Sequence, residues 1–269
     1  MSYTVAIAGL GAIGMKVART LDTGGIDGMS LTAVSAKDQD RARGRVADFA
    51  TPPLVTSAED LANHADIIIE CAPKAIFEVL ARSSLEQGKT FVPLSCAQLL
   101  EHMDLIDVAR ANGGRIIVPT GAIIGLDTIR AMAVGDLQEV TLTTRKPPRG
   151  LEGAPHLVNN NISVEGLTEA KLVFKGTARE AAIGFPANVN VAAALSLAGI
   201  GPDRTTIEVW ADPAVDRNHQ SVKAVSDSGE CEMQIRNIPT EENPRTGRIT
   251  ALSTIACLQR MTAPMVAGT

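Results

Sequence analysis

Short apolar runs alternate with helix-like segments along the first 119 residues of the chain. The runs are small and aliphatic, which is typical of parallel strands buried on both faces. They cover residues 4–8, 31–35, 66–71, 91–95 and 115–119. The segments between them space apolar residues three or four apart, as amphipathic helices do, and cover residues 15–21, 57–61, 74–85 and 101–111. This alternation predicts a mostly parallel sheet with right-handed crossovers.

From residue 120 onward the pattern changes to alternating polar and apolar positions. Such alternation predicts strands of a sheet with one polar face. The alternating runs cover residues 140–145, 171–174, 206–211, 221–225 and 231–235. An alanine-rich run over residues 188–198 predicts a helix that ends at Gly199. A last helix is expected after Asn243 and Pro244, which suit an N-cap and a first helical position, and we expect it to pack on the first half of the chain.

A glycine pattern of the form GxGxxG follows the first strand and opens the first helix. Gly9 allows a tight turn, Gly11 lets a pyrophosphate approach the backbone, and Gly14 lets the helix pack closely on the strand. Ala12 and Ile13 complete a helix N-terminus whose N–H groups attract phosphate. Because a strand, turn, helix and second strand are complete within the first 35 residues, the pattern predicts a dinucleotide site rather than a glycine-rich turn without a ligand.

Together these patterns predict an α/β fold in two domains. One is a Rossmann-type domain with a parallel sheet, and the other is an α+β domain with a mixed or antiparallel sheet. We expect residues 1–119 and 238–269 to form the dinucleotide-binding domain, and residues 120–237 to form the substrate-binding, catalytic and dimerisation domain.

The end of the second strand bears on the choice between NAD and NADP. NAD-binding domains of this type often place an acidic residue there to hold the ribose 2′-hydroxyl. Here the strand ends at Ser35, and Lys37 and Arg41 follow. Ser35 with either cation could accept a 2′-phosphate, so we expect NADP to be accepted at least as well as NAD. The alternative is that both cations are solvated surface charges.

Two later turns are expected to flank the nicotinamide ribose, because ligands bind at the carboxyl ends of parallel strands. The residues concerned are Cys71, Ala72 and Pro73 after the third strand and Ser95 after the fourth. The alternative is that these turns only connect strands to helices.

Composition excludes several classes of protein. The net charge of −5 argues against a nucleic-acid partner, and no apolar run approaches the roughly 18 residues of a membrane span. The N-terminus has no basic and apolar leader pattern, and the four cysteines are scattered. We therefore expect a cytoplasmic protein with reduced thiols and no metal site.

Several segments of the second half carry distinctive residue combinations. They are residues 120–127 (TGAIIGLD), 143–148 (TTRKPP), 176–181 (GTAREA), 185–193 (FPANVNVAA), 197–199 (LAG), 211–213 (ADP), 217–219 (RNH) and 243–246 (NPRT). In this order they resemble the L-aspartate dehydrogenase family, and the resemblance covers essentially the whole chain. It implies an NAD(P)-dependent interconversion of L-aspartate and iminosuccinate, which hydrolyses to oxaloacetate and ammonia or feeds NAD biosynthesis. It also implies a homodimer formed through the sheet of the second domain.

Removal of hydride from the α-carbon of an amino acid needs a neutral amine, so a base with a pKa near neutrality should take a proton from the ammonium group. Histidine suits that task, and His219 is the candidate. The family places its histidine two residues after an asparagine, whereas here His219 follows Asn218 directly and Gln220 holds the expected position. In a strand, a shift of one residue points the side chain to the other face.

The carboxylates of the substrate need amide or cationic partners. Asn188 and Asn190, at the start of a predicted helix, and the backbone of Gly121 and Ala122 are the expected substrate contacts. Asn188 and Ala122 are also expected to contact the cofactor.

Two other functions stay open at this point, because fold does not fix function. One is an NAD(P)-dependent dehydrogenase or reductase of another small amino, imino or hydroxy acid, which a substrate panel would separate. The other is a non-catalytic NAD(P)-binding sensor, which would bind cofactor tightly without turnover. In each enzymatic case the expected partner is a small molecule, with no nucleic acid and no membrane.

Overall fold

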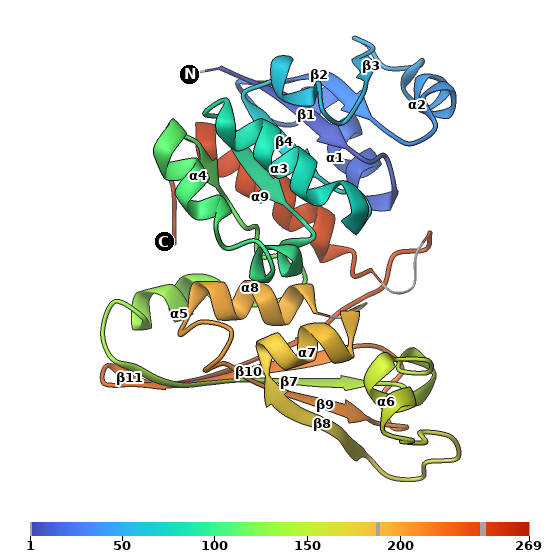
Figure 1. The fold of residues 1–269 in the computed structure, drawn as a ribbon, viewed down its shortest axis with the longest axis vertical. Coiled ribbons are helices and arrows are strands. Elements are labelled where there is room, and N and C mark those ends of the chain that lie inside the picture. Colours follow the sequence, from blue (N-terminus) through green and yellow to red (C-terminus); the bar gives the residue numbers. More distant parts are fainter. Residues whose placement is uncertain (1, 187–188, 243–245, 269) are drawn as a thin grey trace. The chain divides into compact units, whose positions relative to one another are not determined.

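The computed structural model describes residues 2–186, 189–242 and 246–268, which form two compact units. The first unit comprises Met1–Pro119 and Thr250–Val266, and the second comprises Thr120–Ile249 and Ala267–Thr269. The chain therefore completes most of the first unit, builds the second, and returns to the first with its last long helix, α9 (Figure 1).

The first unit contains a six-stranded, fully parallel sheet, as the sequence predicts. Its strands are β1 (Tyr3–Ala8), β2 (Met29–Ser35), β3 (Leu54–Thr56), β4 (Ile67–Glu70), β5 (Thr90–Pro93) and β6 (Arg115–Ile116). Their order in the sheet is β3-β2-β1-β4-β5-β6, so the direction of winding reverses between β1 and β4. In such sheets the ligand crevice lies at the carboxyl ends of the strands at this reversal.

Helices accompany these strands in alternation. They are α1 (Ala12–Asp22), α2 (Gln39–Val46), α3 (Phe77–Glu86), α4 (Leu105–Asn112) and α9 (Ile249–Thr262), with short 3-10 turns η1 (Leu61–Asn63), η2 (Lys74–Ile76) and η3 (Cys96–Leu100). All four residues of β4 are buried, as expected of a parallel strand covered on both faces. Ile255 and Leu258 of α9 belong to the same buried cluster as Val5 and Ile7 of β1.

The second unit contains a five-stranded mixed sheet, which also agrees with the predicted fold class. Its strands are β7 (Leu137–Lys146), β8 (Lys171–Thr177), β9 (Thr206–Ala211), β10 (His219–Ser226) and β11 (Gly229–Arg236). Their order is β11-β10-β7-β9-β8, and within it β7 and β9 run parallel while the other neighbours run antiparallel.

Helices lie along one side of this sheet (Figure 1). They are α5 (Leu126–Met132), α6 (Pro155–Asn159), α7 (Ala178–Gly184) and α8 (Asn190–Ala198), and a 3-10 turn η4 (Pro148–Gly150) follows β7. Because helices cover one side of the sheet, successive residues of β7, β9 and β10 alternate between buried and more exposed positions. We call one side the covered face: Val140, Leu142, Thr144 and Lys146 of β7, Ile207, Val209 and Ala211 of β9, and Gln220, Val222, Ala224 and Ser226 of β10. The residues between them in the same strands, such as Thr143, Trp210 and Ser221, form the open face.

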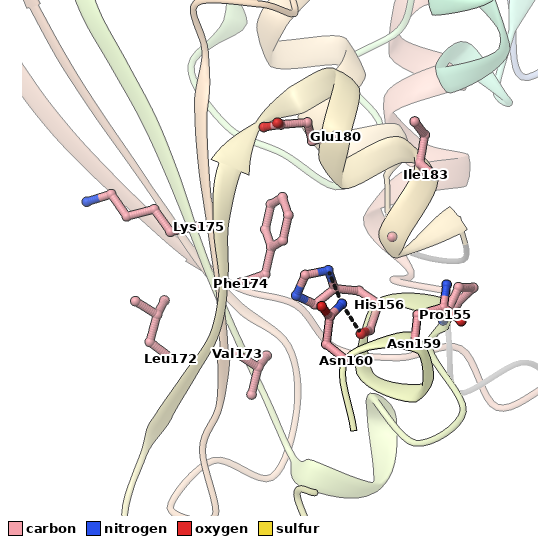
Figure 2. A pocket seen from close by; sticks show the side chains of 11 residues that line it. Pro155, His156, Asn159, Asn160, Leu172, Val173, Phe174, Lys175, Glu180 and Ile183 are labelled. Carbon is pink, nitrogen blue, oxygen red and sulfur yellow. Dashed lines mark hydrogen bonds between the residues drawn. The ribbon is translucent and has the colours of Figure 1, made fainter. Parts of the chain in front are cut away.

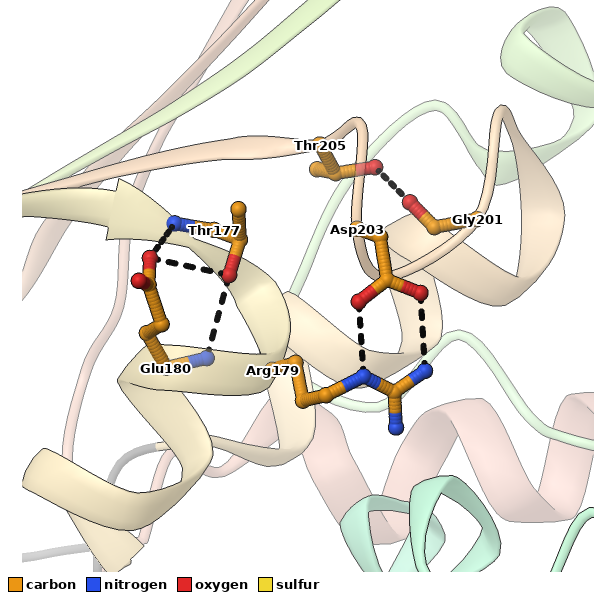
Figure 3. Close-up of polar contacts among 6 residues, drawn as sticks. All are labelled: Thr177, Arg179, Glu180, Gly201, Asp203 and Thr205. Atoms are coloured by element: carbon orange, nitrogen blue, oxygen red, sulfur yellow. Dashed lines mark hydrogen bonds and ion pairs between the residues drawn. The ribbon is translucent and has the colours of Figure 1, made fainter.

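The start of α7 is fixed by a capping box (Figure 3). The Glu180 N–H donates to Thr177 Oγ1 at 3.2 Å, and the Thr177 N–H donates to Glu180 Oε2 at 2.7 Å. Such a cap stabilises a helix by about 1 kcal/mol. Beside it, Arg179 makes a two-pronged ion pair with Asp203, with N–O distances of 2.7 and 2.9 Å. Both of these side chains are exposed, so the pair adds little stability.

Candidate functional site

Two of the three motif glycines are required by close packing in the loop after β1. Gly9 has φ +90°, and a Cβ there would overlap the carbonyl of Cys71. Its N–H donates to the Ser35 carbonyl at 2.8 Å. Gly14 is buried in α1, and a Cβ there would overlap the carbonyl of Gly9. These contacts fix the loop between the ends of β1, β2 and β4.

Gly11 differs from the other two because the space beside it is open. It is exposed and forms the N-cap of α1, and a Cβ built on it would meet no described atom within 4 Å. Ala12 and Ile13, both half-buried, begin the helix behind it. Open space at a helix N-terminus with unpaired N–H groups fits the pyrophosphate of a dinucleotide.

A pocket of about 1020 Å³ continues from this loop. It is lined by Leu10, Gly11, Ala36, Lys37, Asp38, Gln39, Asp40, Arg41, Ala42, Arg43 and Arg45. Both acidic side chains are engaged: Asp38 caps α2 by accepting the Arg41 N–H at 2.9 Å, and Asp40 pairs with Arg43 at 2.6 Å. Among the described residues, neither Lys37 nor the guanidinium of Arg41 takes part in an ion pair. The pocket is therefore cationic where a 2′-phosphate would need it to be.

A buried carboxylate joins the turns that follow β4 and β5. Glu70 has no exposed surface and accepts N–H donors from Ala72 at 2.8 Å and Ser95 at 2.9 Å, and the Ser95 hydroxyl at 3.1 Å. Burial raises the pKa of Glu70, and these hydrogen bonds oppose the rise. Burial also raises the pKa of the Cys71 thiol, which keeps it protonated, while Pro73 is exposed. Glu70 was missed in the sequence, although an acid at the end of an all-apolar strand is an available signal.

The second unit brings three neutral polar groups together. Asn237 Nδ2 donates to the Ala122 carbonyl at 2.9 Å and to Gln220 Oε1 at 3.3 Å. Both amide side chains are buried, with 7% of Asn237 and 5% of Gln220 exposed. Gly121 precedes Ala122 with φ +66°, a conformation that favours glycine. Among the described residues, no acceptor lies within hydrogen-bonding distance of Gln220 Nε2, so this cluster keeps an unused donor.

His219 lies on the other side of the sheet from this cluster. It is in register with Arg145 of β7 and Arg236 of β11, and it belongs to the open face. Burial lowers the pKa of His219, and the charges of Arg236 and Arg217 lower it further. The structure therefore does not bring His219 together with Ala122, because consecutive residues of a strand point to opposite faces.

Arg145 and Lys146 are also divided between the two faces. The guanidinium of Arg145 lies 4.8 Å from the Trp210 ring centre and 3.1 Å from Asp212, on the open face. Lys146 is on the covered face and is 5% exposed, and burial lowers its pKa to about 8. A lysine at a buried position of an alternating strand is a signal that was available in the sequence and was not used.

Of the two asparagines expected to contact the substrate, the structure describes only Asn190. Asn188 lies outside the described residues. Asn190 is the first residue of α8 and is exposed.

A separate pocket of about 650 Å³ lies between α6, β8 and α7 (Figure 2). Phe174 points toward His156, and their ring centres are 5.0 Å apart, whereas Lys175 points away from them. Asn160 Nδ2 donates to the His156 carbonyl at 2.8 Å, which closes the end of α6. None of the site residues expected from the sequence lines this pocket, so it does not add to the cofactor or substrate sites.

Within residues 2–186, 189–242 and 246–268, no helix has the length and apolar character needed to cross a membrane. The same residues contain no group of three or more His, Cys, Asp or Glu side chains arranged to hold a metal ion.

Family comparisons divide the chain where the pattern of its sequence changes. Residues 9–119 match the family model described as the NAD-binding domain of homoserine dehydrogenase. Residues 127–261 match the model described as the C-terminal part of aspartate dehydrogenase.

Relatives that match over nearly their whole length are L-aspartate dehydrogenases. The chain is 50% identical to an L-aspartate dehydrogenase of Bradyrhizobium diazoefficiens, over 98% of this chain and 94% of that protein. It is 48% identical to L-aspartate dehydrogenase 3 of Bordetella bronchiseptica, over 98% and 97% of the two chains. The crystal structure of aspartate dehydrogenase from Thermotoga maritima has the same fold, with a TM-score of 0.77 over the whole of both chains at 23% identity.

Proposed function

The chain belongs to the L-aspartate dehydrogenase family, and we propose that it oxidises L-aspartate to iminosuccinate with NADP or NAD as the oxidant. It is an NAD(P)-dependent amino-acid dehydrogenase. The observation that carries the proposed substrate is the 50% identity to a curated L-aspartate dehydrogenase over nearly the whole chain.

The cofactor site of this proposal is the loop after β1 with its neighbouring turns. When bound, the nicotinamide cofactor supplies the acceptor for the hydride that leaves the α-carbon of the substrate. The residues proposed to surround it are Gly9, Gly11, Ala12, Ile13, Gly14, Ser35, Lys37, Cys71, Ala72, Pro73, Ser95, Ala122 and Asn188. The open space at Gly11 and the paired turns held by Glu70 support this assignment.

We propose that NADP is accepted at least as well as NAD. A 2′-hydroxyl is usually held by an acid at the end of β2. Here the nearest acid, Asp38, already accepts the Arg41 N–H as the cap of α2. Lys37 and the Arg41 side chain take part in no ion pair among the described residues, and they suit a phosphate, whereas Arg45 donates to the carbonyl of Leu10.

The substrate is proposed to lie at the cluster of Ala122, Asn237 and Gln220. Asn237 donates its two amide hydrogens to the Ala122 carbonyl and to Gln220 Oε1, and the second bond orients the Gln220 side chain. Gln220 Nε2 then offers a donor to a substrate carboxylate. Gly121, Asn188 and Asn190 are the further contacts proposed for this substrate.

We also propose that the protein is a cytoplasmic homodimer that pairs through the open face of the second unit. Trp210 and Arg145 on this face are stacked on each other and half-buried, and the described helices of the unit lie on the other side. Light scattering coupled to size exclusion tests the dimer: the mass of two chains is expected, and Trp210→Glu should reduce it to one.

Initial rates of NAD⁺ and NADP⁺ reduction at alkaline pH test the function directly. L-Aspartate is expected to outpace L-glutamate, L-asparagine and L-malate by at least about tenfold in kcat/KM, because L-glutamate is one methylene longer, L-asparagine lacks the second carboxylate and L-malate lacks the amine. Faster turnover of another acid would move the assignment to that substrate. Cofactor binding without turnover of any acid would instead indicate a sensor.

A further inference from the structure

We infer that Lys146, at the end of β7 on the covered face, accepts the proton that leaves the α-ammonium group of the substrate. This assignment rests on the proposed function, because only an amino-acid substrate presents such a proton. His219 is replaced in this role, since its side chain belongs to the open face.

Strand register places Lys146 beside the substrate cluster. Thr144 of β7 pairs directly with Gln220 of β10, and Lys146 is two residues further along β7 on the same face. Diagonal neighbours of this kind have α-carbons about 7–8 Å apart, within reach of a lysine side chain. The Asn237 N–H donates to the carbonyl of Asn218 at 3.0 Å, which holds Asn237 at this same end of the sheet. Lys146, Gln220 and Asn237 therefore share one end of the covered face.

The groups of the substrate cluster cannot accept a proton from an amine, and the carboxylate of Asp212, at the same end of the sheet, is paired with Arg145. Gln220 and Asn237 are amides, and Ala122 contributes a backbone carbonyl. Along the described strands β7, β9 and β10, Lys146 is the one charged side chain on the covered face. A neutral lysine amine is a base of suitable strength for a substrate ammonium.

The surroundings of Lys146 favour its neutral form. Burial lowers the pKa of Lys146 to about 8, close to the value that suits a general base under mildly alkaline conditions. The charged groups of the neighbouring strands face away: Arg145 pairs with Asp212, and His219 lies on the open face.

The charged side chains of the described helices on this side are exposed or have polar partners of their own. Helix α8 carries no titratable side chain from Asn190 to Ala198. In α7, Arg179 pairs with Asp203, and Glu180 is held in its capping box. In α5 the charged side chains are Asp127 and Arg130, both of which are exposed.

The step itself is a single proton transfer. One N–H bond of the substrate ammonium breaks and its electron pair stays on the substrate nitrogen. A new N–H bond forms on Lys146 Nζ, which becomes an ammonium group. The neutral amine that results can supply electrons as the α-carbon loses hydride.

Kinetics of the full-length enzyme test this assignment. Wild type, Lys146→Ala and the surface control Lys171→Met, which replaces an exposed lysine of β8, are compared in NADP⁺ reduction with L-aspartate across a pH series. We expect kcat/KM of the wild type to rise through an apparent pKa of about 8, and kcat of Lys146→Ala to fall by at least about a hundredfold. Methylamine or ethylamine in the medium should restore part of the lost rate in Lys146→Ala and should not accelerate the wild type. Full activity of Lys146→Ala with an unchanged pH profile would overturn the assignment.

A second measurement does not depend on turnover. In protein labelled with ¹³C at lysine Cε, the Lys146 signal is identified by its absence from the spectrum of Lys146→Ala. We expect it to titrate near pH 8 in the wild type, below the range of an ordinary lysine side chain, whose pKa is about 10.4. A Lys146 signal that titrates at about the ordinary lysine pKa of 10.4 would overturn the base assignment. A wild type that does not oxidise L-aspartate would overturn the proposed substrate, so the two failures can be told apart.

Discussion

Replacement of Lys146 by methionine should remove a pH-dependent destabilisation of the second unit. Burial lowers the pKa of Lys146 from 10.5 to about 8, and the side chain is 5% exposed, so solvent screens the effect very little. Each pKa unit corresponds to about 1.4 kcal/mol, which makes the full effect about 3 kcal/mol. Methionine has a similar length and carries no charge, so Lys146→Met isolates this contribution.

The sign follows from proton binding. Below pH 8 the lysine is charged in both the folded and the unfolded chain, and the folded state bears the full cost of a buried charge. Between about pH 8 and pH 10.5 the folded chain has lost this proton while the unfolded chain still holds it. The free energy of unfolding of the wild type therefore rises with pH across this window, and the cost has vanished once both states are neutral.

Urea unfolding at about pH 7 and about pH 10.5, followed by circular dichroism, measures this effect. Relative to Lys146→Met, the wild type should gain about 3 kcal/mol between the two pH values, because other titrating groups are common to both proteins. Lys171→Met, which removes an exposed lysine of β8 in the same unit, should track the wild type. A constant difference between wild type and Lys146→Met would refute the argument, because it would mean that Lys146 titrates alike in the folded and unfolded chains.

Three further outcomes are expected. Gly11→Ala should unfold at the wild-type temperature yet weaken NADPH binding at least about tenfold, because its Cβ enters only the space proposed for pyrophosphate. Gly14→Ala should lower the free energy of unfolding by about 1–3 kcal/mol, because its Cβ overlaps the Gly9 carbonyl. Similar behaviour of the two variants in thermal melting and in fluorescence titrations with NADPH would contradict this. Replacing Lys37 and Arg41 together by alanine should raise the Kd of NADPH at least about tenfold more than that of NADH, and equal losses would rule out a 2′-phosphate contact. Thr177→Ala should destabilise the second unit by about 1 kcal/mol in urea unfolding, which Thr177→Ser should largely prevent; equal losses in the two variants would mean that the capping hydroxyl is not responsible.

The parallel sheet was predictable because its central strands are continuous apolar runs, and such runs identify buried strands without any knowledge of their neighbours. The edge of this sheet formed by β3, and the helix α2 before it, could not be predicted in the same way. Strand β3 has three residues, none of them buried, and it follows two prolines, while α2 is almost wholly polar and buries only Ala42 and Val46. The pattern at residues 57–61 predicted a helix, but the structure has a 3-10 turn at Leu61–Asn63 instead.

In the second unit the alternating runs located all five strands, whereas α5, α6 and α7 were missed. These helices have seven residues or fewer, which is about two turns and too short for a helical period to emerge from the sequence.

The candidate site was predictable only where it is local in sequence. The glycine loop is a continuous motif, and each glycine can be assigned its physical role in advance. The bond between Asn237 and Ala122 joins residues 115 positions apart, so no local pattern indicates it. The division of Arg145 and Lys146 between opposite faces depends on strand register, and so does the separation of His219 from Gln220. Register is fixed by the assembled sheet, and for that reason a base chosen from the sequence alone fell on the open face.

The most direct test of the central claim is the steady-state reduction of NADP⁺ and NAD⁺ by the purified full-length chain with L-aspartate as the substrate. The account predicts robust turnover with both cofactors, a kcat/KM with NADP⁺ at least equal to that with NAD⁺, and a preference for L-aspartate over the other acids of the panel. Tight binding of NADPH with no reduction of either cofactor by L-aspartate would contradict it.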